Sequence, residues 1–171
     1  MTWAFSDESE RAATMFFGML FVPTVSLHDA RREMRGLLLP GQRRVHMAKE
    51  GARRRKAILD VVLQLDASSV VVRLRRPLGV TRVQARERLL ATACGLACEA
   101  DVWILDAQDD AQLRRDRHLI ELEFAQGGPV YDHQPSNEEP MLWAVDALLW
   151  AYGAGGEAKR RAGTRVSILE I

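Results

Sequence analysis

Three aspartates occupy positions where an ionised carboxylate is unfavourable unless something binds it. Asp7 follows the apolar run 3–5, and Asp106 follows the apolar run 102–105. Asp146 is the single charge in a helical stretch that is otherwise apolar nearly all round. Such a carboxylate must be hydrogen-bonded, paired with a base or bound to a metal ion. If the two strands are neighbours in one sheet, the three aspartates can converge at one edge of it.

An oxygen-only cluster of this kind suits Mg²⁺ or Mn²⁺, which keep several waters and accept substrate phosphate oxygens. Two such ions roughly 3.5–4 Å apart activate a water and stabilise the leaving oxygen in phosphodiester cleavage. We therefore predict that Asp7, Asp106 and Asp146 are metal ligands and catalytic residues. Glu8 could join them only if the strand ends at Asp7, because consecutive residues of a strand point to opposite faces.

Each acid also has a structural interpretation. Asp7 could lie in a solvated turn that closes a hairpin. Asp146 could be the buried partner of one of the many arginines, an arrangement common for a charge inside a protein. The first prediction that separates these interpretations is geometric: the strands that carry Asp7 and Asp106 should be neighbours or near-neighbours, with both carboxylates at the same edge of the sheet.

The periodicity of apolar residues predicts an α/β fold in which strands alternate with helices. The run 13–23 should pair with 3–5 as a hairpin, and further strands are expected at 42–47, 68–74, 101–106, 130–133 and 164–171. Helices are expected at 26–38, from 48 to about 65, and at 81–100, 111–123 and 141–152. Segment 157–163 is predicted to be a basic turn.

A cluster of basic residues precedes the apolar stripe of the second helix. It consists of Arg53, Arg54, Arg55 and Lys56. Such a cluster either contacts nucleic-acid phosphates at the rim of a site or forms an ordinary solvated helix face. If it binds phosphates, replacing two members by alanine should weaken binding to all sequences alike.

Length and composition favour one domain, 1–171. With 171 residues and 47% hydrophobic content, the chain can bury one full core. The 24 Lys and Arg balance 23 Asp and Glu, so nucleic acid would have to be held by a local patch. Cys94 and Cys98 lack the partners of a zinc site, and we expect free thiols. No run approaches the roughly 20 apolar residues of a membrane span, so we expect a cytoplasmic protein.

The sequence resembles the domain of unknown function 3800 family along nearly its whole length. The resemblance rests on Asp7-Glu8-Ser9 followed by a strand with Gly18, on His46 before a basic helix, and on Asp106 ending a strand. It also includes Ser136, ten residues before Asp146. The resemblance implies a ribonuclease-H-like mixed sheet flanked by helices and a metal-dependent nuclease site, with Ser136 supporting the carboxylates.

Two functions remain open from the sequence. The first is a Mg²⁺- or Mn²⁺-dependent nuclease acting on RNA or DNA, with His46 as a positioning or proton-transfer group beside the aspartates. The second is a non-catalytic module of the same fold that binds a protein or nucleic acid. Approach of the three aspartates to within metal-bridging distance would favour the nuclease, and an arginine filling the space between them would favour the binding module.

Overall fold

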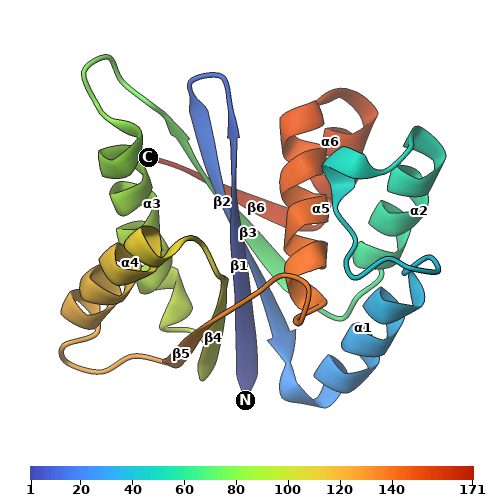
Figure 1. The fold of residues 1–171 in the computed structure, drawn as a ribbon, viewed down its shortest axis with the longest axis horizontal. Coiled ribbons are helices and arrows are strands. Elements are labelled where there is room, and N and C mark those ends of the chain that lie inside the picture. Colours follow the sequence, from blue (N-terminus) through green and yellow to red (C-terminus); the bar gives the residue numbers. More distant parts are fainter.

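The computed structural model describes all residues, 1–171, and is built around one mixed sheet of six strands. The strands, in chain order, are β1 (Thr2–Arg11), β2 (Thr14–Pro23), β3 (Ser68–Arg75), β4 (Val102–Asp106), β5 (Val130–Gln134) and β6 (Val166–Glu170). Their order across the sheet is β5-β4-β1-β2-β3-β6 (Figure 1). β2 runs antiparallel to β1 and β3, and the other neighbouring pairs are parallel.

Helices cover both faces of the sheet (Figure 1). They are α1 (Thr24–Gly36), the short 3₁₀ helix η1 (Met47–Lys49), α2 (Ala52–Val62), α3 (Arg82–Ala97), α4 (Asp110–Glu123), α5 (Met141–Ala154) and α6 (Gly156–Ala162). One core lies between the sheet and α1, α2, α5 and α6. A second core lies between the opposite face and α3 and α4. A sheet covered on both faces needs apolar residues on both, as in the fully buried stretch Met15–Val22 of β2.

Alternation along β1 distributes its residues between the two cores. Phe5 belongs to the core under α5, whereas Ala4 belongs to the core under α3. Because the alternation has a period of two, Asp7 lies on the α5 face and Glu8 on the α3 face. The same reasoning places Asp106 on the α5 face, because Ile104 packs into that core.

Most predicted elements are present, and the fold class is the predicted α/β arrangement. The capping box at the start of α3 is confirmed, with the Thr81 hydroxyl accepting from Gln84 N. β5 and β6, each of five residues, are the two edge strands of the sheet. No helix of the structure is long and apolar enough to cross a membrane.

Three local predictions are wrong. Segment 42–47 is not a strand. It is irregular, and Val45 and Met47, whose spacing suggested a strand, pack into the core without pairing to the sheet. Residues 157–163 are not a turn, since α6 spans Gly156–Ala162. The first strand does not end at Asp7 but continues to Arg11, paired with β2 throughout.

Candidate active site

Asp7 and Asp106 stand side by side on neighbouring strands. β1 and β4 are parallel, and their register pairs Ser6 with Leu105, so the next residues along both strands are the two aspartates. Parallel neighbours in register point to the same face, and adjacent strands are about 4.8 Å apart. The geometric prediction of adjacency is thus confirmed.

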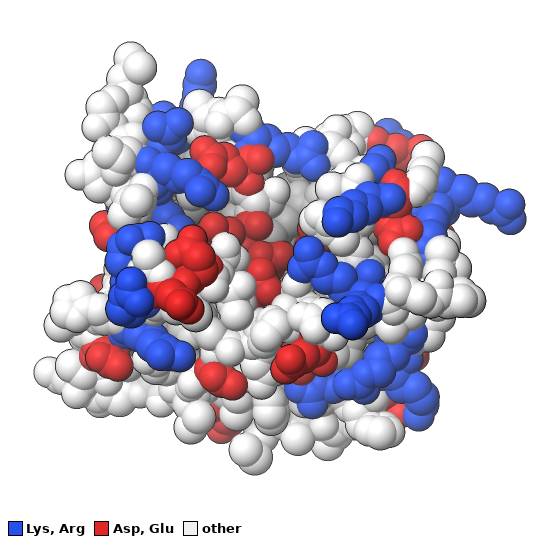
Figure 2. Space-filling model, viewed as in Figure 1, with Lys and Arg blue, Asp and Glu red and all other residues white.

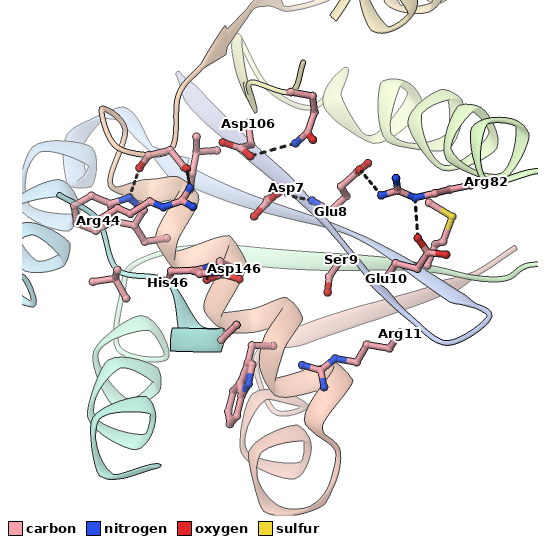
Figure 3. A pocket seen from close by; sticks show the side chains of 18 residues that line it. Asp7, Glu8, Ser9, Glu10, Arg11, Arg44, His46, Arg82, Asp106 and Asp146 are labelled. Atoms are coloured by element: carbon pink, nitrogen blue, oxygen red, sulfur yellow. Dashed lines mark hydrogen bonds and ion pairs between the residues drawn. The ribbon is translucent and has the colours of Figure 1, made fainter. Parts of the chain in front are cut away.

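Asp146 reaches the same place from α5, which packs across β1 and β2 (Figure 3). Close packing is possible because Gly18, the cross-strand partner of Asp7, has no side chain. A Cβ at Gly18 would lie 2.9 Å from Val145 Cγ1 and 3.0 Å from Leu149 Cγ. Gly18 therefore lets the helix turn that carries Asp146 settle directly over the strand that carries Asp7.

The three aspartates line one pocket of about 340 Å³. His46, Ser136 and Arg44 also line it. In the space-filling view the acidic side chains occupy a central hollow, and basic side chains stand on both sides of it (Figure 2). The pocket thus combines an acidic floor with basic margins, a distribution suited to a polyanion held by its rim and approached by cations at its centre.

Electrostatics show that the acids influence one another. Burial raises the pKa of Asp7 well above its ordinary value, and the charges of Asp106 and Asp146 raise it further. Burial also raises the pKa of Asp106, although the Arg44 charge opposes that shift. The charges of two neighbouring acids thus add to the effect of burial on the pKa of Asp7, and a bound cation would relieve that repulsion.

The Asp106 carboxylate is only half satisfied by the chain. Its Oδ2 accepts a hydrogen bond from Gln108 Nε2 at 3.2 Å, while its Oδ1 is buried without a hydrogen-bond partner. The hydroxyl and the backbone N–H of Ser136 both lie near enough to Asp106 to lower its pKa, although neither reaches Oδ1 within ordinary hydrogen-bond geometry. Buried polar atoms are rarely left unpaired, so Oδ1 is an available ligand atom in the pocket.

Asp146 is held by the loop that precedes α2. Its Oδ2 accepts a hydrogen bond from Met47 N at 2.8 Å and lies 3.3 Å from His46 Nδ1. No arginine pairs with Asp146, and 24% of its side chain is exposed, so the alternative interpretation of Asp146 as the buried partner of an arginine is wrong. His46 lies beside Asp146, where it can orient the carboxylate.

Glu8 points away from the three aspartates (Figure 3). Because β1 continues past Asp7, the condition under which Glu8 could be a ligand is not met. Its side chain instead pairs with the buried Arg86 and lies 3.9 Å from Arg82 Nη2 on the α3 face. Its backbone N–H does serve the site, donating to Asp7 Oδ1 at 2.7 Å.

Ser136 and Arg44 form a small unit at the pocket margin. The Arg44 guanidinium donates to Ser136 Oγ, and the indole N–H of Trp143 donates to the Ser136 carbonyl. Ser136 thereby fixes Arg44 near Asp106. Sequence reasoning missed Arg44, which stands in an irregular loop with no pattern to mark it.

The basic cluster at the start of α2 is divided between two roles. Arg54 bonds to Glu50 and to the Leu37 carbonyl, and Arg55 bonds to the Met47 carbonyl at 2.8 Å. These two side chains hold the loop that presents His46. Arg53 and Lys56 are exposed and remain available for phosphates.

The residues present fit a hard divalent cation. No three Asp, Glu, His or Cys side chains already lie close enough together to coordinate one ion. Mg²⁺, however, is commonly held by only one or two carboxylates, with waters and substrate phosphates completing its octahedron. The unpartnered Asp106 Oδ1 and the raised pKa values of Asp7 and Asp106 are what such an ion would relieve.

Comparisons with known proteins support the fold. No protein-family model matches the chain, and no curated protein does. A chain in the structure of the PCNA:RNase HII complex from Archaeoglobus fulgidus superposes with a TM-score of 0.57 at 14% identity, covering 96% of this chain and 76% of that one. Ribonuclease H2 from Pyrococcus horikoshii OT3 gives a TM-score of 0.48 at 17% identity, covering 87% and 70%. The superposition on the chain of the Archaeoglobus fulgidus complex shows a ribonuclease-H-like fold.

Proposed function

We propose that this protein is a divalent-metal-dependent nuclease that cleaves phosphodiester bonds of RNA or DNA. The observation that carries the proposal is the convergence of Asp7, Asp106 and Asp146, from two strands and a helix, on one pocket without an arginine salt bridge among them. The ribonuclease-H-like fold agrees with it, since ribonuclease HII is named in the solved relative. Membership of the domain of unknown function 3800 family is part of the same proposal.

The three aspartates would hold Mg²⁺ or Mn²⁺, which would polarise the phosphate and activate a water. The chain itself prepares the site. Gly18 leaves room for α5 to pack close to β1. The backbone N–H of Met47 and the ring of His46 orient the Asp146 carboxylate, and the backbone N–H of Glu8 orients Asp7. Arg44 is the cation nearest Asp106 and can contact a phosphate oxygen of the substrate.

A second function, a non-catalytic module that binds nucleic acid or a protein, is favoured by two specific observations. The positive charge of Arg44 acts to lower the pKa of Asp106, so one of the three acids already has a basic neighbour. In addition, the donors are not gathered around one point. In that case the pocket would be a binding surface whose acids serve recognition.

The deciding experiment is a cleavage screen. End-labelled single- and double-stranded RNA, DNA and hybrid are incubated with Mg²⁺, Mn²⁺ or a chelator. We expect ion-dependent cleavage of at least one substrate, its loss in Asp146→Asn with the fold preserved by circular dichroism, and full retention in Asp29→Asn. Asp29 is a suitable control because its side chain lies on the exposed side of α1 and pairs only with Arg32. Intact substrates with the wild-type protein in both ions would refute the nuclease and favour the binding module.

A further inference from the structure

A second pocket continues from the candidate active site toward the end of α5. It has a volume of about 210 Å³ and lies between the β1–β2 hairpin, the end of α5, α6 and β6. Arg11 lines both this pocket and the one that contains the three aspartates. The two pockets thus adjoin at Arg11, and we call the pair of pockets the groove.

Arg11 is aligned with Asp7. Residues 7, 9 and 11 of β1 share a face of the sheet, and at about 3.3 Å per residue the Cα atoms of Asp7 and Arg11 are separated by about 13 Å. Measured along a duplex axis at about 3.4 Å per step, this distance corresponds to about four nucleotides. A strand bound at the aspartates would therefore reach Arg11 within a few nucleotides.

The position of Arg11 is built into the fold. Its side chain occupies the space that a Cβ at Gly153 would fill, so the absence of a side chain there seats Arg11 on the last turn of α5. In the close view the side chain reaches from the strand toward that helix (Figure 3). Arg11 has no carboxylate partner among the ion pairs of the protein, and its charge is free to meet an external anion.

Two further cations line this second pocket, Lys159 and Arg73. Lys159 lies 5.6 Å from the centre of the Tyr152 ring, which steadies its ammonium group, and it too has no carboxylate partner. Arg73 pairs with the exposed Glu170 at 2.7 Å. The groove therefore carries two uncompensated cations and one compensated cation, a set suited to backbone phosphates.

We propose that Arg11 and Lys159 form a phosphate subsite that guides the substrate strand out of the active site along β1 toward α6. The inference rests on the proposed nuclease function and specifies its substrate: a polynucleotide that extends at least about four nucleotides to one side of the reacting phosphate. The subsite contacts backbone phosphates, so it adds affinity without reading base sequence.

The test measures binding, separately from cleavage. Fluorescence anisotropy, recorded in the presence of a chelator, measures the binding of fluorescein-labelled RNA and DNA oligonucleotides of 4 and 12 nucleotides to the protein. We expect the wild type to bind the 12-mer at least about 10-fold more tightly than the 4-mer, a preference that Arg11→Ala/Lys159→Ala removes. The salt dependence of 12-mer binding should flatten by about two units of slope, one for each lost phosphate contact.

Arg88→Ala/Arg117→Ala is the matched control. It removes two exposed cations from α3 and α4, on the opposite face of the sheet, and should leave the length preference unchanged. Arg11→Lys keeps the charge and should retain most of the affinity. If the double variant is unstable, Lys159→Ala alone removes one exposed side chain and should flatten the slope by about one unit.

The outcomes separate the subsite from the catalytic function. An unchanged length preference in the double variant, or wild-type protein that binds neither oligonucleotide, overturns the subsite. If the wild type binds the 12-mer through Arg11 and Lys159 but cleaves nothing in Mg²⁺ or Mn²⁺, the nuclease fails and the subsite stands. If the wild type cleaves a substrate in Mg²⁺ or Mn²⁺ but the double variant keeps the length preference, the nuclease stands and the subsite fails.

Discussion

Two groups of acids lie on opposite faces of the sheet and meet different neighbours. On the α3 face, Glu8 and the buried Asp116 share Arg86, and Arg82 flanks Glu8 and pairs with Glu10. On the α5 face, Asp7, Asp106 and Asp146 have no arginine salt bridge. Adjacent residues of one strand, Asp7 and Glu8, thus belong to two different electrostatic environments.

The pKa values record this difference. Although burial raises the pKa of Asp116, His133 and the Arg86 guanidinium hold it below its ordinary value. Arg86 is the stronger partner, since its Nη2 donates to Asp116 Oδ2 at 3.0 Å whereas His133 Nε2 is 3.7 Å away. Burial and neighbouring charges instead raise the pKa of Asp7. The chain thus supplies an arginine to Glu8 and Asp116 on the α3 face, whereas Asp7 on the α5 face has no ion-pair partner in the protein.

The largest effect is expected from Arg86→Met, which leaves Asp116 buried without its cation. Removing one member of a buried ion pair typically lowers the free energy of unfolding by about 3–5 kcal/mol. Urea denaturation at pH 7 measures the loss. Arg82→Ala is the control, because its side chain is 65% exposed and should matter by less than about 1 kcal/mol. Equal, small losses in both variants would contradict the structural role of Arg86.

Neutralising Asp7 and Glu8 in turn should change stability in opposite directions. Glu8→Gln weakens a charged hydrogen bond to Arg86 and should lower the free energy of unfolding by about 1–2 kcal/mol. Asp7→Asn removes an unfavourable charge and, without metal, should raise the melting temperature by a few degrees, since about 1 kcal/mol corresponds to about 2–4 °C. Thermal unfolding in a chelator measures both. A destabilised Asp7→Asn would contradict the absence of a countercharge.

The gain from Asp7→Asn should depend on pH. Because the pKa of Asp7 is raised in the folded state, its penalty to stability is absent below the ordinary value of 3.8, grows as pH rises from there toward the folded-state pKa, and is complete above it. The difference between Asp7→Asn and wild type should therefore be present at pH 7 and vanish by about pH 4. Added Mg²⁺ should stabilise the wild type and not the variant.

A smaller effect is expected from His46→Ala. Residues that orient a metal ligand commonly contribute 10–100-fold to metal affinity. Because Met47 N still holds the Asp146 carboxylate, we expect the lower limit, about 10-fold weaker Mg²⁺ binding. The Mg²⁺ dependence of the melting temperature gives the affinity, and His28→Ala on exposed α1 is the control. Unaltered Mg²⁺ affinity would leave His46 without a positioning role.

The smallest effect is expected from Arg53→Ala/Lys56→Ala. Both side chains are exposed, whereas Arg54 and Arg55 are engaged with the protein. Nucleic-acid binding should weaken uniformly across sequences, with a salt slope lowered by about one unit at most, which is less than for Arg11 and Lys159. Anisotropy titrations at several salt concentrations compare the two pairs. Identical slopes for wild type and variant would assign the α2 cluster to a solvated helix face.

The sequence by itself determined the elements with strong periodicity and the three acids that interrupt them. β3, α3 and α5 follow from local pattern and capping, and an apolar run that ends in a carboxylate identifies Asp106 without a structure. The same pattern located Asp7 but misjudged the end of its strand. Alternation could not show that β1 remains paired with β2 as far as Arg11, which is what turns Glu8 away from the site.

Only the tertiary structure decided which charges meet. No local signal places Met47 N against Asp146, Arg44 near Asp106, or Arg11 on Gly153, because each contact joins segments far apart in the chain. The alternative of an arginine partner for Asp146 could not be excluded from the sequence for the same reason, because only the packing shows that Met47 N and His46 are its neighbours. The local sequence determines which charged residues are costly to bury, and the packing of helices on the sheet determines which partner each of these residues meets.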